Sequence, residues 1–401
     1  MNEWKKVKLG DCISTKKGFA FKSALYTNCG VPVVRVSDFT LDSVADNDLV
    51  YYPHAEKDRY DEYVLNEGDV LIQTVGSWQY NPNSVVGKVV RVPYYHKGSL
   101  LNQNIVKIIP NNGYNNAFIF YRLKCRDFAG HVLGEARGAA NQASITLDTI
   151  KRFSFDCPLL STQQRIATIL SRYDSLIENY RKQIKLLEEA AQRLYKEWFI
   201  DLRFPGHENT KIVDGVPEGW EKKKLHEIAE VVMGSSPKSE FYNNDKQGLP
   251  FHQGVGSYGT RFVDDNVYST SITRLAEPNS ILFSVRAPVG RLNITKHKII
   301  IGRGLAAMNH KDGFQSFLFY MLKERFFMDN IIGNGSIFAS ISKVELLDQE
   351  FIVPPMKTIK EFESLASKLD KKIQGVDTQL RLLTEARDRL LPKLMSGEIT
   401  V

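Results

Sequence analysis

The hydrophobic residues of this chain follow two patterns, one typical of mixed α/β units and one typical of long helices. Short runs rich in Val and Ile, bounded by Gly, Pro and Asn, predict β-strands at residues 31–36, 70–75, 85–92 and 105–109, and again at 280–285 and 298–301. Two related segments, FIFYRLK at 118–124 and FLFYMLK at 317–323, place apolar residues on one helical face. We expect their aromatic rings to pack in a core.

The second pattern begins after Pro158 and is repeated after Pro354, where apolar residues recur three and four positions apart. This spacing predicts two long helices with a coiled-coil seam. A helix of about 33 residues is about 50 Å long at a rise of about 1.5 Å per residue. The predicted seam residues are Ile177, Ile184, Leu187 and Leu194 in the first helix and Ile373, Leu380, Leu383 and Leu390 in the second.

These paired features are two copies of one unit. The tryptophan segments WKKVKL and WEKKKL, the Gly-apolar-Pro motifs at 30–32 and 248–250, and the segments ASIT and ASIS at 143–146 and 339–342 occur in the same order in both halves. The long helices match best, with identical residues at the positions of Asp174, Ile177, Gln183, Leu186, Leu187, Glu189, Ala190, Arg193 and Leu194. Residues 20–110 match least, which places the variation in loops.

The repeat predicts an α+β fold with two mixed α/β domains joined by two long antiparallel coiled-coil helices and related by pseudo-two-fold symmetry. Each helix is the C-terminal arm of a repeated unit and buries its seam most simply against the other, with the globular units at opposite ends. The turn-forming segments LRFPGHENT and DGVPEGW mark the start of the second copy. We therefore expect domains at 1–157 and 206–353 and helical regions at 158–205 and 354–401.

Composition places the chain among reduced, globular proteins. Its 401 residues are 43% hydrophobic, which supports several cores. Its four cysteines include no C-x-x-C pair and its eight histidines no H-x-x-x-H pair, so the spacing of a metal site is absent. The N-terminus has no apolar signal core, and no stretch is long enough to span a membrane. We expect a cytoplasmic protein without a metal.

The positions of the charged residues are more informative than the net charge of +7. Residues 70–126 contain no Asp or Glu but seven Lys and Arg residues, among them Lys88 and Arg91, and residues 279–311 contain no acid but six basic residues. Two acid-free segments in the same part of both copies indicate a surface that faces a polyanion.

Motifs for catalysis are absent. The string GVGSYG at 254–259 fits a dinucleotide fingerprint but has no helix predicted after it, and YNPN at 80–83 lacks the second proline and the aromatic residue of an amino-methyltransferase motif. No Ser/His/Asp or Cys/His arrangement and no P-loop is present. Two other functions stay open beside a non-catalytic, polyanion-binding protein: a single-chain DNA methyltransferase or nuclease with an unrecognised site, and a helical scaffold that does not bind DNA.

The whole chain resembles the specificity subunit of Type I restriction-modification systems. The resemblance rests on the passage YKEWFIDLRFPG at 195–206, on the GVPEGW segment at 215–220 that opens the second copy, and on the Phe-x-x-Pro motifs at 155–158 and 351–354 before the helical regions. The first copy lacks the P-x-G-W motif before Trp4.

The resemblance implies a non-catalytic subunit whose two target recognition domains each read one half of a bipartite double-stranded DNA target. It implies that the helices set the spacer between the halves and dock two modification subunits, which use S-adenosylmethionine for DNA methylation. It also allows two restriction subunits, which use ATP and Mg²⁺, to join. This chain itself would hold no cofactor.

Base reading requires side chains that match base edges, and the acid-free segments supply them. We expect DNA contacts from Lys88, Arg91 and a further set of polar residues, although any one of these can instead be an exposed loop residue without a contact. That set comprises Gln73, Gln79, Asn102, Gln103 and Asn104 in the first copy and Arg286, Arg291, Asn293 and Arg303 in the second.

Overall fold

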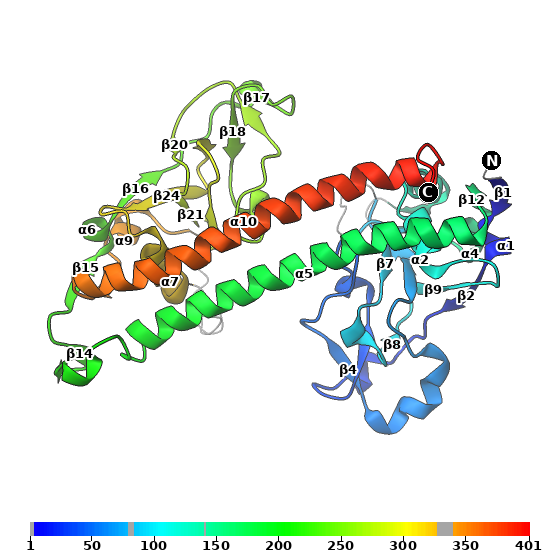
Figure 1. The fold of residues 1–401 in the computed structure, drawn as a ribbon, viewed down its shortest axis with the longest axis horizontal. Coiled ribbons are helices and arrows are strands. Elements are labelled where there is room, and N and C mark those ends of the chain that lie inside the picture. The colour runs from blue at the N-terminus through cyan, green and yellow to red at the C-terminus, as the bar shows by residue number, and fades with distance from the viewer. Residues whose placement is uncertain (1–3, 79–83, 140–141, 327–339) are drawn as a thin grey trace. The chain divides into compact units, whose positions relative to one another are not determined.

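The computed structural model describes residues 4–78, 84–139, 142–326 and 340–401. The chain divides into two compact units, unit 1 with Met1–Asn179 and Leu380–Val401, and unit 2 with Tyr180–Gln379. Helix α5 (Leu160–Phe199) begins in unit 1 and ends in unit 2, and helix α10 (Met356–Met395) does the reverse (Figure 1). Each unit therefore contains part of both long helices.

Both predicted long helices are present and are longer than expected, at 40 residues each. Each begins two residues after the proline of a Phe-x-x-Pro motif, and the phenylalanine of that motif is buried in the strand that precedes the helix. The proline cannot donate a main-chain hydrogen bond and restricts the residue before it, so it separates the strand from the helix.

Unit 1 is built mainly on antiparallel strand pairing, with one parallel pair in its second sheet. Its main sheet has the order β2-β9-β5-β7 and packs with a second sheet of order β4-β3-β8. The strands of these two sheets are β2 (Ile13–Lys17), β9 (Ile105–Pro110), β5 (Val70–Gln73), β7 (Val89–Arg91), β4 (Val50–Tyr52), β3 (Val31–Val34) and β8 (Leu100–Leu101). Smaller pairings join β1 (Lys5–Lys8) to β12 (Ser154–Cys157), and β10 (Arg137–Ala139) to β11 (Gln142–Ser144) and β6 (Val75–Gly76).

Unit 2 repeats this plan. Its main sheet has the order β16-β24-β21-β22, which corresponds strand by strand to the main sheet of unit 1. These strands are β16 (Ala229–Met233), β24 (Leu305–His310), β21 (Ile281–Ser284) and β22 (Leu292–Ile294). The second sheet contains β17 (Tyr242–Asn243), β19 (Tyr268–Ser269), β18 (Leu249–His252), β23 (Ile299–Ile301) and β20 (Leu275–Ala276), and the smaller pairs are β15 (Glu221–Lys224) with β25 (Glu350–Val353) and β13 (Ile212–Val213) with β14 (Val216–Pro217).

Short helices complete each unit, and their caps explain some of the repeated residues. Asn115 caps α2 through its side chain, and Thr146 and Ser342 cap equivalent short helices in the two units, which accounts for the last position of the ASIT and ASIS segments. The α-helices are α1 (Leu9–Cys12), α2 (Asn116–Leu123), α3 (Arg126–Glu135) and α4 (Leu147–Arg152) in unit 1, and α6 (Leu225–Ile228), α7 (Gln315–Phe326) and α9 (Lys343–Leu347) in unit 2. The 3-10 helices are η1 (Ser23–Leu25), η2 (Val36–Asp38), η3 (His54–Tyr63), η4 (Tyr94–His96), η5 (His207–Asn209), η6 (Ser239–Phe241) and η7 (Val255–Ser257).

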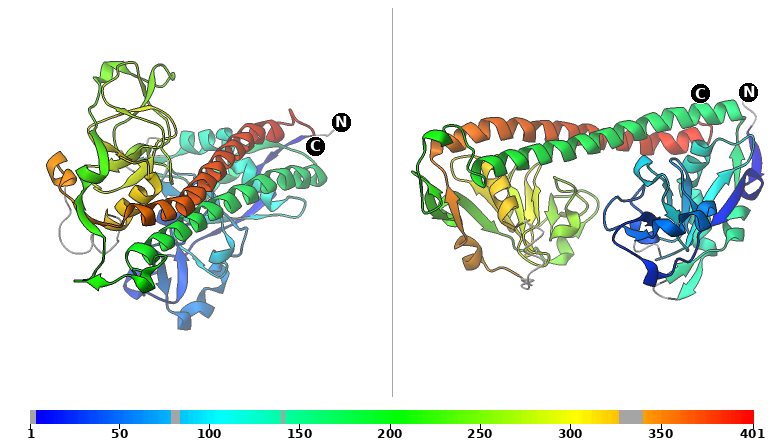
Figure 2. Two further views of the ribbon diagram at one scale, coloured as in Figure 1. Left: turned by 60° about the vertical axis from the view of Figure 1, so that its left-hand side comes forward. Right: turned by 90° about the horizontal axis from the view of Figure 1, so that it is seen from below.

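In each unit the sheets lie on one side of the helical segments, and the core forms where they meet (Figure 2). In unit 1 the start of α5 packs with the end of α10 through Ile166, Leu170 and Leu394. In unit 2 the end of α5 packs with the start of α10, where Phe362 contacts the rings of Tyr195 and Phe199. Within each unit, therefore, the two helices run antiparallel.

The predicted seam residues of the two long helices are buried to different degrees. Ile177, Ile184 and Ile373 are buried, whereas the five leucines, Leu187, Leu194, Leu380, Leu383 and Leu390, are only half-buried. The rings of the FxFYxLK segments lie in the cores as expected, in α2 and α7. No helix among the described residues is long and apolar enough to cross a membrane.

Candidate nucleic-acid interface

The two acid-free segments cover corresponding parts of the fold. In unit 1 the segment runs from β5 through β7, β8 and β9 into α2, and in unit 2 it covers β21, β22, β23 and β24. Both segments therefore include two central strands of the main sheet and the loops that connect them.

Main-chain hydrogen bonds define which loop residues correspond. The amide of Thr74 donates to the carbonyl of Asn104 at 2.8 Å, as Val285 does to Gly304 at 2.9 Å. Similarly, the main-chain amide of Gln73 donates to the carbonyl of Lys88, and the main-chain amide of Ser284 donates to the carbonyl of Arg291, both at 2.9 Å. These matched bonds make the turn at 102–104 equivalent to the turn at 302–304, and Lys88 equivalent to Arg291.

The equivalent turns are held tightly by the loops that follow β2 and β16. A Cβ atom on Gly18 would lie 1.9 Å from the carbonyl oxygen of Asn102, and one on Gly234 would lie 2.1 Å from that of Gly302. Only glycine permits so close an approach of two backbones. The backbone of both turns is thereby fixed, while the central side chain of each turn stays exposed.

Those central side chains are Gln103 in unit 1 and Arg303 in unit 2, and both are exposed. The amide of Gln103 donates to the carbonyl of Phe19 at 2.8 Å, and the amide of Arg303 donates to Oγ of Ser236 at 3.1 Å. A glutamine suits an adenine edge and an arginine suits a guanine edge, so these two exposed side chains differ in the base edge that each could hydrogen-bond. Asn104, the next residue, is half-buried with φ at 66°.

Three predicted amides hold loops in place instead of facing solvent. Gln73 is fully buried, and its Nε2 donates to the carbonyls of Val75 and Ser84, both at 2.9 Å. Asn293 is 1% exposed, and its Nδ2 donates to the carbonyl of Gly259 at 3.0 Å. Asn102 is also buried, and its Oδ1 accepts from the amide of Gln103 at 2.7 Å.

The predicted cations differ in exposure between the units. In unit 2, Arg286, Arg291 and Arg303 are all exposed. In unit 1, Lys88 is half-buried and donates to the carbonyl of Phe39 at 3.3 Å, and Arg91 is half-buried with its guanidinium 5.3 Å from the ring centroid of Phe120. Burial, with the nearby Lys124 ammonium, lowers the pKa of Lys88. Gln79 lies outside the described residues.

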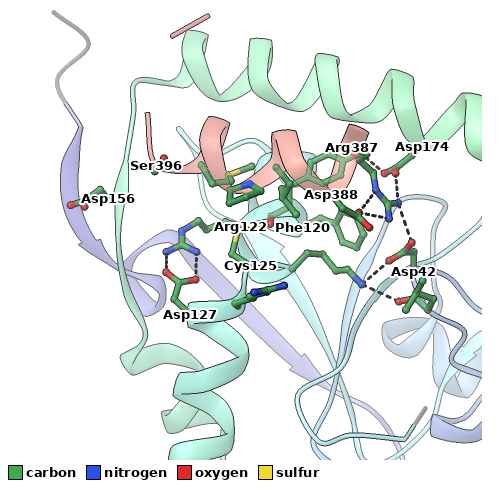
Figure 3. Close-up of a pocket in the computed structure, with 17 residues that line it drawn as sticks. Asp42, Phe120, Arg122, Cys125, Asp127, Asp156, Asp174, Arg387, Asp388 and Ser396 are labelled. Atoms are coloured by element: carbon green, nitrogen blue, oxygen red, sulfur yellow. Dashed lines mark hydrogen bonds and ion pairs between the residues drawn. The ribbon is translucent and has the colours of Figure 1, made fainter. Parts of the chain in front are cut away.

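A second polar cluster lies in unit 1 where the sheets meet the helices. Tyr121 of α2 donates to Oδ2 of Asp174 of α5 at 2.5 Å. Nη1 of Arg387 of α10 lies 2.9 Å from Oδ1 of Asp174 and 3.1 Å from Oδ2 of Asp42, a residue of the loop before β4 (Figure 3). Lys124 closes the cluster, with Nζ 2.7 Å from Oδ1 of Asp42. The cluster lines a cavity of about 820 Å³.

Unit 2 contains the corresponding cluster with a different source of the arginine. Tyr320 of α7 donates to Oδ1 of Asp370 of α10 at 2.7 Å. Arg261, from the loop after η7, lies 2.7 Å from the same oxygen and 3.7 Å from Oε1 of Glu188 of α5. Its guanidinium carbon is 3.6 Å from the ring centroid of Phe319.

The electrostatics of both clusters keep the tyrosines as donors. Burial, then the Asp174 carboxylate, raises the pKa of Tyr121, and burial raises the pKa of Tyr320 although Arg261 opposes it. Lys124 and Arg387 lower the pKa of Asp42 against the opposing effect of burial. The pKa of Arg387 is raised by Asp42 and Asp174, again against burial.

Sequence reasoning assigned the tyrosines to core packing and did not find these clusters. The available signal was the identity of Tyr121 with Tyr320 and of Asp174 with Asp370 in the aligned repeats. A carboxylate retained at the same place on both apolar-faced helices indicates a specific partner.

Comparison with known proteins supplies the wider context. The sequence model described as "Type I restriction modification DNA specificity domain" matches residues 1–189 and 217–381. The chain is 28% identical over 381 residues, 93% of its length and 88% of the relative's, to the "Putative type I restriction enzyme MjaX specificity subunit" of Methanocaldococcus jannaschii. It is 30% identical over 318 residues, 75% of its length and 73% of the relative's, to the "Type I restriction enzyme MjaIX specificity subunit" of the same organism.

A solved structure has the same fold. The S subunit of a Type I restriction-modification system from M. genitalium superposes with a TM-score of 0.58 over 98% of this chain and 96% of that chain, at 17% sequence identity.

Proposed function

Since this chain belongs to the family of Type I restriction-modification DNA specificity subunits, we propose that its two units each read one half of a bipartite double-stranded DNA target. Specificity subunits recognise DNA and are not catalytic, in agreement with the absence of catalytic motifs from the sequence. The observation that carries the proposal is the equivalence of the turns at 102–104 and 302–304 within the acid-free segments.

Different side chains on one repeated frame are what a bipartite reader requires. Phosphate contacts position a protein on DNA, whereas contacts to base edges confer sequence choice. We assign base reading to Gln103, Asn104 and Arg303. We assign contacts to the DNA backbone to Arg286 and Arg291 in unit 2, and to Arg91 and Lys88, the counterpart of Arg291, in unit 1. The loops of this interface are held by hydrogen bonds of the buried side chains of Gln73, Asn102 and Asn293.

The long helices carry two further roles, the spacing of the two readers and the docking of partners. Residues on the seam that are identical in α5 and α10, such as Ile177 and Leu187, are explained by packing. Packing does not explain residues that are identical at exposed positions. Leu186, Glu189 and Arg193 of α5 are exposed, and so are their identical counterparts Leu382, Glu385 and Arg389 of α10. A repeated exposed face supports the docking of two copies of one partner.

That partner is the modification subunit, which would bring S-adenosylmethionine and the methyltransferase site. Restriction subunits, with ATP and Mg²⁺, would join for cleavage. The complex would act in the cytoplasm, where the host DNA is methylated.

The test is to express this chain with its neighbouring modification subunit and to sequence the methylated sites. We expect adenine methylation at one sequence of two fixed halves and a spacer of constant length. Methyl transfer by this chain alone, with DNA, Mg²⁺ and labelled S-adenosylmethionine, would instead establish a single-chain enzyme. A complex without salt-sensitive DNA binding would favour a protein scaffold.

A further inference from the structure

The polar clusters at the two sheet-helix junctions are equivalent, and each has the form of a clamp. Tyr121 and Tyr320 occupy the same position in the FxFYxLK segments, and Asp174 and Asp370 the same position in the aligned long helices. The tyrosine hydroxyl donates to the carboxylate at 2.5 Å in unit 1 and at 2.7 Å in unit 2. We name these the unit 1 clamp (Asp42, Tyr121, Asp174, Arg387) and the unit 2 clamp (Glu188, Arg261, Tyr320, Asp370).

Each clamp joins the globular part of its unit to both long helices through one arginine. In the unit 1 clamp the arginine comes from α10 and holds a carboxylate of α5 and one of the globular part. In the unit 2 clamp the arginine comes from the globular part, donates to the carboxylate of Asp370 in α10 at 2.7 Å, and forms a longer ion pair, at 3.7 Å, with that of Glu188 in α5. The residue of α5 that corresponds to Arg387 is Ala191, which is fully buried. The arginine of the unit 2 clamp is therefore not on α5 but is Arg261 of the globular part.

Packing alone does not account for this construction. Arg261 is 3% exposed and Tyr320 is fully buried, and burying such groups costs free energy that an apolar contact would not. Charged and hydrogen-bonded groups add a constraint on relative orientation, because a hydrogen bond weakens steeply once its donor and acceptor rotate out of alignment. A clamp thus restricts the angle between a globular part and the helices more narrowly than a hydrophobic contact does.

We propose that Tyr121 and Tyr320, together with Arg387 and Arg261, are positioning residues that fix the angle of each recognition domain on its helices and thereby the spacer length that the subunit accepts. The inference rests on the proposed bipartite function. Successive base pairs are about 3.4 Å apart along the duplex, so a tilt that moves a reading turn by this distance changes the accepted spacer by one base pair.

The test uses the intact complex of this chain with its modification subunit. After the half-sequences are known, three duplexes are compared, with the natural spacer and with spacers one base pair shorter and longer. The variants are Tyr121→Phe, Tyr320→Phe and the double variant, because each removes one hydroxyl and leaves the ring in the core. The readout is the ratio of the methylation rate on the natural spacer to the rates on the altered spacers.

A matched control removes a tyrosine hydroxyl away from the clamps. Oη of Tyr242 donates to the carbonyl of Pro237 at 2.9 Å in unit 2. Tyr242→Phe should leave the spacer ratio as it is in the wild-type complex.

We expect each clamp variant to lower the spacer ratio roughly three- to tenfold, the scale of one ordinary intramolecular hydrogen bond, and the double variant to lower it further. The half-sequences should not change. An unchanged ratio, with or without a lower melting temperature, overturns the positioning role and leaves the clamps as purely structural. If the wild-type complex methylates no bipartite sequence at all, the proposed function itself has failed, which is a separate outcome.

Discussion

Gln103 and Arg303 occupy the same position in the two repeated units, each exposed at the centre of a turn whose backbone is fixed against a glycine. Because the frames are equivalent, the proposed base reading by these two side chains would differ between the two units. This relationship supports separate and exchangeable specificities in one chain.

Substitution at these turns should change one half of the target only. Arg303→Gln should reduce discrimination at one base pair in the half read by unit 2, by roughly 5- to 150-fold, because a bidentate pair with a base is worth about 1–3 kcal/mol. Sequencing of methylated sites measures the change. Lys211→Ala, which removes an exposed charge outside the acid-free segments, serves as the control. If both halves are altered, the units are not separate readers.

Exchange of residues 1–157 for the same region of a relative should replace one half-sequence and leave the other and the spacer intact. The incoming region needs a carboxylate at the position of Asp42, since Arg387 in α10 otherwise loses one partner. Methylated-site sequencing of the chimera, with and without that carboxylate, checks both statements. A chimera in which both halves differ from the wild type contradicts the modular arrangement.

The exposed arginines of unit 2 should act through the phosphate backbone. Arg286→Ala and Arg291→Ala should weaken DNA binding by the complex on specific and unrelated duplexes alike, and each lost phosphate contact should reduce the slope of log K against log salt by about 0.9. Titrations at several salt concentrations measure the slope. Unchanged affinity on every duplex would remove both residues from the interface.

An insertion in the helices should lengthen the spacer. Four residues placed after Ala190 keep the helical phase approximately and lengthen α5 by about 6 Å, which corresponds to one or two base pairs. The methylated sequence should then retain its halves with a longer gap. An active complex with the original gap would mean that the helices serve partner docking and are not the ruler.

The unit 1 clamp predicts a pH-dependent contribution to stability. The pKa of Asp42 is lowered in the folded state, so its ionised form stabilises the fold above its unfolded pKa of about 3.9, and this contribution is lost as pH falls through the lower, folded value. Asp42→Asn should lower the unfolding free energy at pH 7 by about 1–3 kcal/mol and should matter progressively less as the pH falls below the unfolded pKa of Asp42. Urea unfolding across this range measures the difference, with the exposed Asp46→Asn as control. A penalty that does not depend on pH would show that the charge is not the cause.

The sequence by itself determined the architecture of each unit and the kind of protein. Periodicity is a local property, so the long helices, the aromatic face of the FxFYxLK segments and the main-sheet strands β5, β7, β9 and β21 were readable from residue spacing. The other four main-sheet strands, β2, β16, β22 and β24, were not predicted from the sequence. The boundaries were less accurate, since α5 and α10 each extend beyond the periodic apolar residues.

Only the tertiary structure decided which polar residues are available to a ligand. Gln73, Asn102 and Gln103 lie in the same acid-free segment, yet two are buried as loop supports and one is exposed, because exposure depends on strands that pair across long sequence distances. The same holds for the clamps. Arg387 and Arg261 are not equivalent in the aligned sequence but reach equivalent carboxylates, since the fold brings a helix end to one junction and a loop to the other.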